Sequence, residues 1–85
     1  MDISRAEQRI LHLLAQGGRI EIERNDNRKI AVINCFNRDG WHYAALDIVM
    51  FRKLKRHKAI ASKSGAPYLI TKRGLQLVRS ELNNR

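Results

Sequence analysis

The sequence predicts one α+β domain, because helical and strand periodicities alternate along its 85 residues. Three segments repeat apolar residues at three- and four-residue spacing, which is typical of helices with one buried face. Between them lie two strand-like stretches, each interrupted by turn residues, which is typical of hairpins. The predicted order is helix, hairpin, helix, hairpin, helix. We assign residues 1–85 to a single domain, since so short a chain buries one modest core.

The first helix is predicted over about 4–16. Ser4 and Glu7 have the spacing of a capping box, in which each side chain bonds the other residue's backbone amide. Gly17-Gly18 supplies the left-handed residue that commonly ends a helix. The predicted buried stripe comprises Ala6, Ile10, Leu11, Leu13 and Leu14.

A hairpin is predicted over 19–36. Residues 19–24 alternate strictly between polar and apolar, as in a strand with one solvated face, and residues 25–28 are turn formers. Residues 29–36 are rich in β-branched side chains but alternate poorly, which allows this strand to be covered on both faces. Residues 37–40 form a second turn. Residues 41–45 either extend the sheet or begin a helix.

The second half is predicted to hold two helices around a short hairpin. Asp47 can cap a helix over about 48–58, with Met50, Phe51 and Leu54 buried. A strand over 59–62, a loop over 63–67 and a strand over 68–70 follow. Thr71 can cap a last helix. The predicted core stripe of that helix comprises Leu75, Val78 and Leu82.

A basic helix followed by a strand, a glycine-bearing loop and a strand matches the recognition helix and wing of winged-helix domains. We therefore predict a winged-helix-like fold. In the standard fold a shorter strand and another helix stand where this chain has its first hairpin. Alternatively, residues 41–46 supply a degenerate second helix.

Positive charge is concentrated in the second half. The net charge is +9, and residues 43–85 contribute +8 of it. Such an excess commonly faces a polyanion. Nucleic acid is the first candidate, followed by an acidic protein surface and then an anionic membrane surface. The alternative is a solubilising surface.

The densest cluster of cations lies on the predicted second helix. An α-helix fits the major groove of DNA, and its cations can neutralise phosphates. The cations opening the last helix stand near free backbone amides, which also bind phosphate. This pattern indicates a polyanionic partner, with double-stranded DNA favoured over single strands. It does not indicate a particular base sequence. The predicted binding residues are Arg52, Lys53, Lys55, Arg56 and Lys58, with Lys63, Lys72 and Arg73 as a supporting rim.

Trp41 and Tyr43 are the candidate protein interface. They stand two residues apart and share one face if the segment is extended. Burial in the core or in a partner interface is favoured over stacking on nucleobases.

No catalytic residue, metal site or cofactor is expected. Cys35 reads as a mid-strand apolar residue, and a Cys35–His42 pair lacks an orienting acid and an oxyanion hole. Cys35 and His42 alone are too few for a closed metal site. The sequence has no signal peptide and no apolar stretch long enough to span a bilayer, so we expect a cytoplasmic protein.

Short strings along the whole chain match the pattern of a known family. The strings are Glu7–Arg9, Leu11-His12, Leu14-Ala15, Gly17–Ile20, Arg38–Gly40, Phe51, Lys53–Lys55, Ile60, Pro67-Tyr68, Ile70-Thr71, Gly74-Leu75, Val78-Arg79, Leu82 and Asn84-Arg85. Together they resemble the YjhX family of small bacterial proteins, described as toxins of toxin-antitoxin pairs. The resemblance covers essentially the whole chain, although Trp41–Tyr43 and Asn25–Asn27 depart from the family pattern. It implies an acetyltransferase-like antitoxin and a target, DNA topoisomerase I, inhibited by obstruction. It assigns no functional residues.

Two functions follow as hypotheses. The leading one is a non-enzymatic toxin that inhibits a DNA-processing enzyme by binding the enzyme, its DNA or both. The alternative is a winged-helix transcriptional regulator that binds a defined DNA sequence. Membrane attachment is disfavoured, because the apolar stripe of the basic helix is needed for the core.

Overall fold

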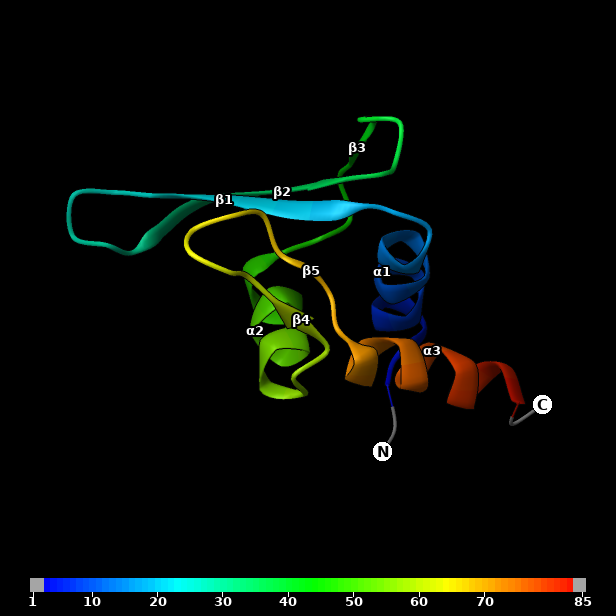
Figure 1. Cartoon of the computed structure of the whole chain (residues 1–85). Helices are drawn as coiled ribbons and strands as arrows, with labels where there is room; N and C mark the ends of the chain where they lie inside the picture. The colour runs from blue at the N-terminus through cyan, green and yellow to red at the C-terminus, as the bar shows by residue number, and fades with distance from the viewer. Residues whose placement is uncertain (1–2, 84–85) are drawn as a thin grey trace.

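The computed structural model describes the backbone of residues 3–83 and the side chains of residues 3–79. The fold is α+β, with three helices and two small antiparallel sheets (Figure 1). Leu82, predicted in the core, lies outside the described side chains. The elements in order are α1 (Arg5–Ala15), β1 (Arg19–Arg24), β2 (Ile30–Phe36), β3 (His42–Tyr43), α2 (Ile48–Arg56), β4 (Ile60–Ala61), β5 (Leu69–Ile70) and α3 (Lys72–Asn83).

The capping box predicted for the first helix is confirmed. Ser4 Oγ accepts a hydrogen bond from Glu7 N at 3.1 Å, and Ser4 N donates to Glu7 Oε1 at 3.3 Å. The helix ends where Gly17 adopts a φ of +106°. Ala6, predicted on the buried stripe, is exposed, so the stripe begins one turn later at Ile10 and Leu11.

The first sheet has the order β1-β2-β3. Ile20 of β1 pairs with Cys35 of β2, and Cys35 pairs in turn with Tyr43 of β3. Residues 42–43 therefore extend the sheet, and the alternative of a helix in this segment is wrong. The sheet has one covered face only, since Val32 on β2 is exposed while Cys35 is buried.

The second sheet is the short hairpin of β4 and β5, in which Ile60 pairs with Ile70. A single bridge joins it to the first sheet. Ile20 N donates to the Tyr68 carbonyl at 3.0 Å, and Tyr68 N donates to the Ile20 carbonyl at 2.7 Å. The loop between β4 and β5 is therefore anchored to the middle of the molecule.

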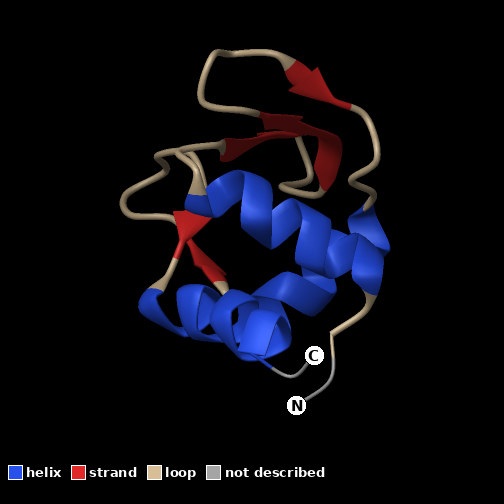
Figure 2. Cartoon of the chain, turned by 90° about the vertical axis from the view of Figure 1, so that its right-hand side faces the viewer, coloured by secondary structure: helices blue, strands red, loops and turns tan. Residues whose placement is uncertain are grey.

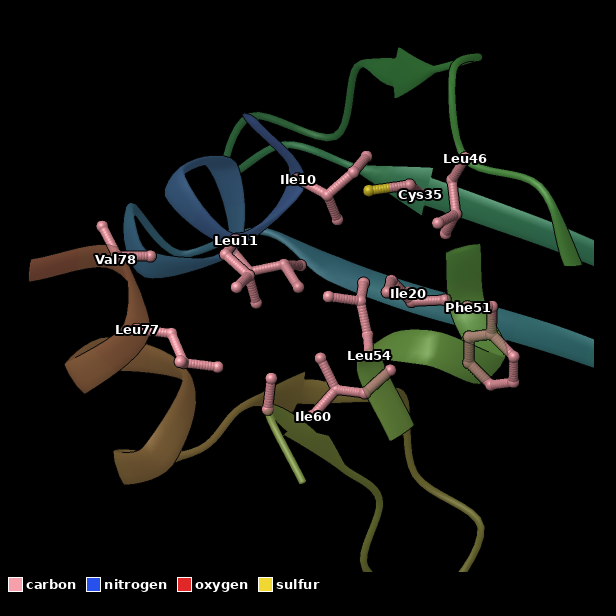
Figure 3. Packing of buried hydrophobic residues seen from close by; sticks show 12 residues of the cluster. Ile10, Leu11, Ile20, Cys35, Leu46, Phe51, Leu54, Ile60, Leu77 and Val78 are labelled. Carbon is pink, nitrogen blue, oxygen red and sulfur yellow. The ribbon is translucent and has the colours of Figure 1, made fainter. Parts of the chain in front are cut away.

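All three helices lie on one side of the first sheet (Figure 2). The buried apolar residues form one cluster between them, drawn in Figure 3. No helix within residues 3–83 is long and apolar enough to cross a bilayer. The buried apolar cluster comprises Ile10, Leu11, Leu14, Ile20, Cys35, Leu46, Phe51, Leu54, Ala59, Ile60, Leu77 and Val78.

Candidate nucleic-acid interface

The orientation of α2 is set by its cap and its apolar side. Asp47 Oδ1 accepts from Met50 N at 2.8 Å, as its N-cap position predicts. Phe51 and Leu54 are completely buried against the rest of the core. Because side chains on a helix are spaced by about 100°, the remaining side of α2 faces solvent.

The exposed side of α2 carries four cations. Arg52 and Arg56 are one turn apart and therefore lie on the same side of the helix, with Lys53 and Lys55 on its flanks. All four are exposed. Among the described side chains, Arg19 pairs with Glu21, and Glu7 lies 3.8 Å from His57, which is charged only when protonated. Neither contact involves a lysine or arginine of α2. The charge of this surface is therefore not neutralised by any described carboxylate.

Lys55 lies where α2 meets the β4–β5 hairpin. Its Nζ is 5.7 Å from the ring centroids of both Phe51 and Tyr68. These rings pack edge to face with centroids 5.1 Å apart. Cation–π attraction and ring packing thus hold the basic helix against the hairpin.

Lys58 lies just after α2 and ends it. Lys58 N donates to the Lys55 carbonyl at 2.9 Å and Ala59 N to the Leu54 carbonyl at 3.0 Å, which is a Schellman motif. The motif needs a left-handed residue, and Lys58 supplies it with a φ of +58°. The prediction that the helix extends to residue 58 is therefore wrong by two residues. A lysine gives no sequence signal for this stop, where glycine is usual.

Thr71 joins the end of α2 to the start of α3. Its Oγ1 donates to the Lys58 carbonyl at 2.6 Å and accepts from Gly74 N at 3.0 Å. Thr71 therefore caps the last helix, as predicted. Lys72 and Arg73 open that helix and are exposed. The hydrogen bonds place the backbone of Lys58 directly beside the backbone that carries these two cations.

Lys63 stands at the tip of the β4–β5 hairpin. Ala66 N donates to the Lys63 carbonyl at 3.0 Å, and Ser64 and Gly65 between them have φ values of +53° and +78°. Two positive φ angles are typical of a type I′ turn, which joins short strands tightly. All eight predicted cations are thus exposed, on α2 and just after it, on this turn and at the start of α3.

Trp41 and Tyr43 lie in different environments. Trp41 is 75% exposed, so its predicted alternative of burial in the core is wrong. Its backbone N and carbonyl both bond Asn37, which fixes the turn before β3. Tyr43 is half-buried against the core. Only Trp41 is therefore open to a partner or to a base.

His57 and Glu7 form a partly buried pair that the sequence analysis missed. The His57 side chain is 21% exposed, and its Nδ1 lies 3.8 Å from Oε2 of the buried Glu7. Neither of these two atoms has a hydrogen-bond partner among the described residues. The pair connects the start of α1 to the end of α2. The sequence does indicate this burial of His57, because His57 follows the buried Leu54 by three residues and so lies on the same side of the helix.

Cys35 is not placed for nucleophilic chemistry. Burial raises the pKa of its thiol from 9.0 to about 11, so little thiolate forms near neutral pH. Within the described residues, no group of three His, Cys, Asp or Glu side chains could hold a metal ion.

The raised thiol pKa predicts a loss of stability in alkali. Above pH 9 the unfolded chain releases the thiol proton while the folded chain keeps it, so the unfolded state gains free energy of ionisation. Between pH 7.5 and 10.5, the free energy of unfolding should fall by about 2 kcal/mol more in the wild type than in Cys35→Ala. Urea denaturation at both pH values measures this difference. Equal losses in the two proteins would contradict it.

The fold and the site together define a small basic α+β protein whose unpaired cations gather on one helix and the elements beside it. All 85 residues match the family described as "Putative toxin of bacterial toxin-antitoxin pair", the YjhX toxin family. The chain is similar over its whole length, and over the whole of each relative, to UPF0386 proteins of Rhizobium johnstonii (67% identical), Rhizobium meliloti (69%) and Agrobacterium fabrum (67%). It therefore belongs to the YjhX family. No solved structure gave a significant match.

Proposed function

We propose that this protein is a non-enzymatic toxin that binds duplex DNA and thereby obstructs a DNA-processing enzyme in the cytoplasm. The observation that carries the proposal is the exposed, unpaired set of cations on α2, together with those on the β4–β5 turn and at the start of α3. DNA topoisomerase I is the candidate enzyme, from the resemblance to the family. The predicted antitoxin, an acetyltransferase-like protein, would release the DNA by covering the same cations.

A winged-helix mode of binding is supported by the chain order and by one strand bridge. The basic helix α2 is followed directly by a short hairpin, the order of a recognition helix and its wing. The bridge between Ile20 and Tyr68 joins that hairpin to the strand after α1. In this mode α2 would enter the major groove, and Lys63 on the turn would contact a neighbouring phosphate.

The salt dependence of duplex binding follows from the number of phosphate contacts. Each phosphate contact contributes about 0.9 to the slope of log affinity against log salt on duplex DNA. Eight contacts would give a slope of roughly −7. Such binding carries little sequence information, since phosphates are the same at every base pair.

The proposal is tested by two measurements on the wild-type chain. The first is fluorescence anisotropy with a short duplex between 50 and 200 mM salt, where we expect affinity to fall steeply as salt rises. The second is relaxation of supercoiled DNA by topoisomerase I, where we expect inhibition that excess competitor duplex relieves. A flat salt dependence would refute DNA binding. Inhibition that persists in excess duplex would indicate contact with the enzyme itself.

One feature favours a sequence-specific regulator as the second candidate function. Arg52 and Arg56 lie on the same exposed side of α2, and arginine is the commonest reader of guanine in the major groove. Footprinting on the promoter of the chain's own operon distinguishes the two. A discrete protected site, absent from unrelated DNA of equal length, would favour the regulator. Uniform protection would favour the toxin that binds the backbone.

A further inference from the structure

We propose that the tip of the β1–β2 hairpin, residues 24–29, is a second phosphate-binding arm that acts beside the β4–β5 turn on the same duplex. The inference rests on the proposed function, because it assigns further contacts to the same ligand. The tip carries three cations, Arg24, Arg28 and Lys29, against one carboxylate, Asp26, and all four residues are exposed.

Hydrogen bonds give the tip a defined shape. Asn25 N donates to the Lys29 carbonyl at 2.8 Å, and Arg28 N donates to the Asn25 carbonyl at 2.9 Å. Asn25 Oδ1 also accepts from Asn27 N and Lys29 N. Arg24 Nη1 donates to the Arg28 carbonyl at 3.0 Å and so closes the loop. Cations held on a preformed loop lose less entropy when they bind than cations on a flexible one.

The arm stands next to the β4–β5 turn. In Figure 1 both extend toward the same side of the molecule, away from α1 and α3. A shared hollow is lined by Ile22 and Arg24 from the first hairpin and by Ser62, Gly65, Ala66 and Tyr68 from the second. Phosphates recur about every 3.4 Å along each strand of a duplex. The arm and the turn, which line one hollow, can therefore contact separate phosphates of one duplex.

Backbone strain at Arg28 is the second line of evidence. Arg28 has a φ of +61°, in the left-handed region that glycine adopts without cost. It closes a three-residue hairpin loop at the position where glycine is usual. Among the described contacts, the Arg28 side chain makes no hydrogen bond or ion pair. The backbone of Arg28 is held by hydrogen bonds within the loop, whereas its guanidinium has no described partner and is free to contact a phosphate.

Lys58 is likewise a cation in a left-handed position favoured by glycine. Ser64 is the third non-glycine residue with a positive φ in the described chain, and it is uncharged. The three positions allow a matched comparison. Glycine should relieve backbone strain at each of them, but it removes a charge only at Arg28 and Lys58.

The test is a set of glycine substitutions measured for stability and for duplex affinity. Arg28→Gly should raise the urea midpoint, weaken duplex binding about eightfold at 0.1 M salt and reduce the salt slope by about 0.9. Adding Lys29→Ala should double the change in slope. Ser64→Gly should raise the urea midpoint and leave the salt slope unchanged, because it removes no charge. Arg28→Lys keeps the charge and should keep the salt slope.

The failures of the arm and of the proposed function can be told apart. An unchanged slope in Arg28→Gly/Lys29→Ala, with the wild type still showing steep salt dependence, would overturn the arm alone. A wild type that does not bind duplex would overturn both. Loss of binding to an acidic polypeptide but not to duplex, in the same variant, would also overturn the arm and would assign the tip to a protein partner.

Discussion

Replacing Phe51 by alanine should lower the free energy of unfolding by about 3–5 kcal/mol, the usual loss for a buried phenylalanine. Phe51 is completely buried, and its ring packs edge to face on Tyr68. A domain of 85 residues has a total stability of roughly 4–13 kcal/mol. The substitution should therefore remove a large fraction of the total stability. Urea denaturation followed by circular dichroism measures the loss.

Val49→Ala is the matched control for Phe51→Ala. Val49 lies on the same helix but is 59% exposed, so its truncation should change stability by no more than about 0.5 kcal/mol. A loss below 1 kcal/mol for Phe51→Ala would contradict the packing of α2 against the β4–β5 hairpin.

Gly74→Ala should lower the free energy of unfolding by about 1–3 kcal/mol, although alanine normally favours a helix. A Cβ at this position would overlap the carbonyl oxygen of Ala59 and lie 2.6 Å from Ile70 Cγ1. Much of this contact is with backbone, which cannot rotate away. The loss should appear as a lower urea midpoint with an unchanged slope.

Arg73→Ala provides the comparison for Gly74→Ala, since it creates the same residue one position earlier at an exposed site. It should leave stability within about 0.5 kcal/mol of the wild type. A Gly74→Ala protein as stable as Arg73→Ala would show that α3 does not approach Ala59 closely.

Local motifs were predicted well because their partners are near in sequence. The capping box of Ser4 and Glu7, the Asp47 cap and the Thr71 cap each join residues three apart, so the spacing alone reveals them. The strand over residues 42–43 could not be assigned, because it exists only through pairing with β2. Its two residues carry too little periodicity to be recognised.

Features of the site that depend on distant contacts were not predictable. Glycine is locally unfavourable in a helix, which marks position 74 as unusual, but the close neighbour of Gly74, Ala59, is fifteen residues away. Lysine at 58 and arginine at 28 give no signal for a left-handed backbone, because both residues normally avoid it. The exposure of the α2 cations, by contrast, follows directly from helical spacing once Phe51 and Leu54 are buried.

The proposed function requires that the position of the positive charge on the protein, and not the total charge, determines its affinity for duplex DNA. Two triple variants with equal net charge separate these possibilities. Arg52→Ala/Lys53→Ala/Arg56→Ala removes cations of α2 that make no described packing contact with the rings of Phe51 or Tyr68. Arg5→Ala/Arg9→Ala/Arg79→Ala removes exposed cations from α1 and α3.

Duplex DNA affinity measured against salt concentration for these two variants is the decisive measurement. The α2 variant should lose roughly 2.7 from its salt slope, about 0.9 for each phosphate contact. The α1 and α3 variant should keep the wild-type slope. Equal losses of salt slope in the two variants, or no loss in either, would contradict a DNA-binding surface centred on α2.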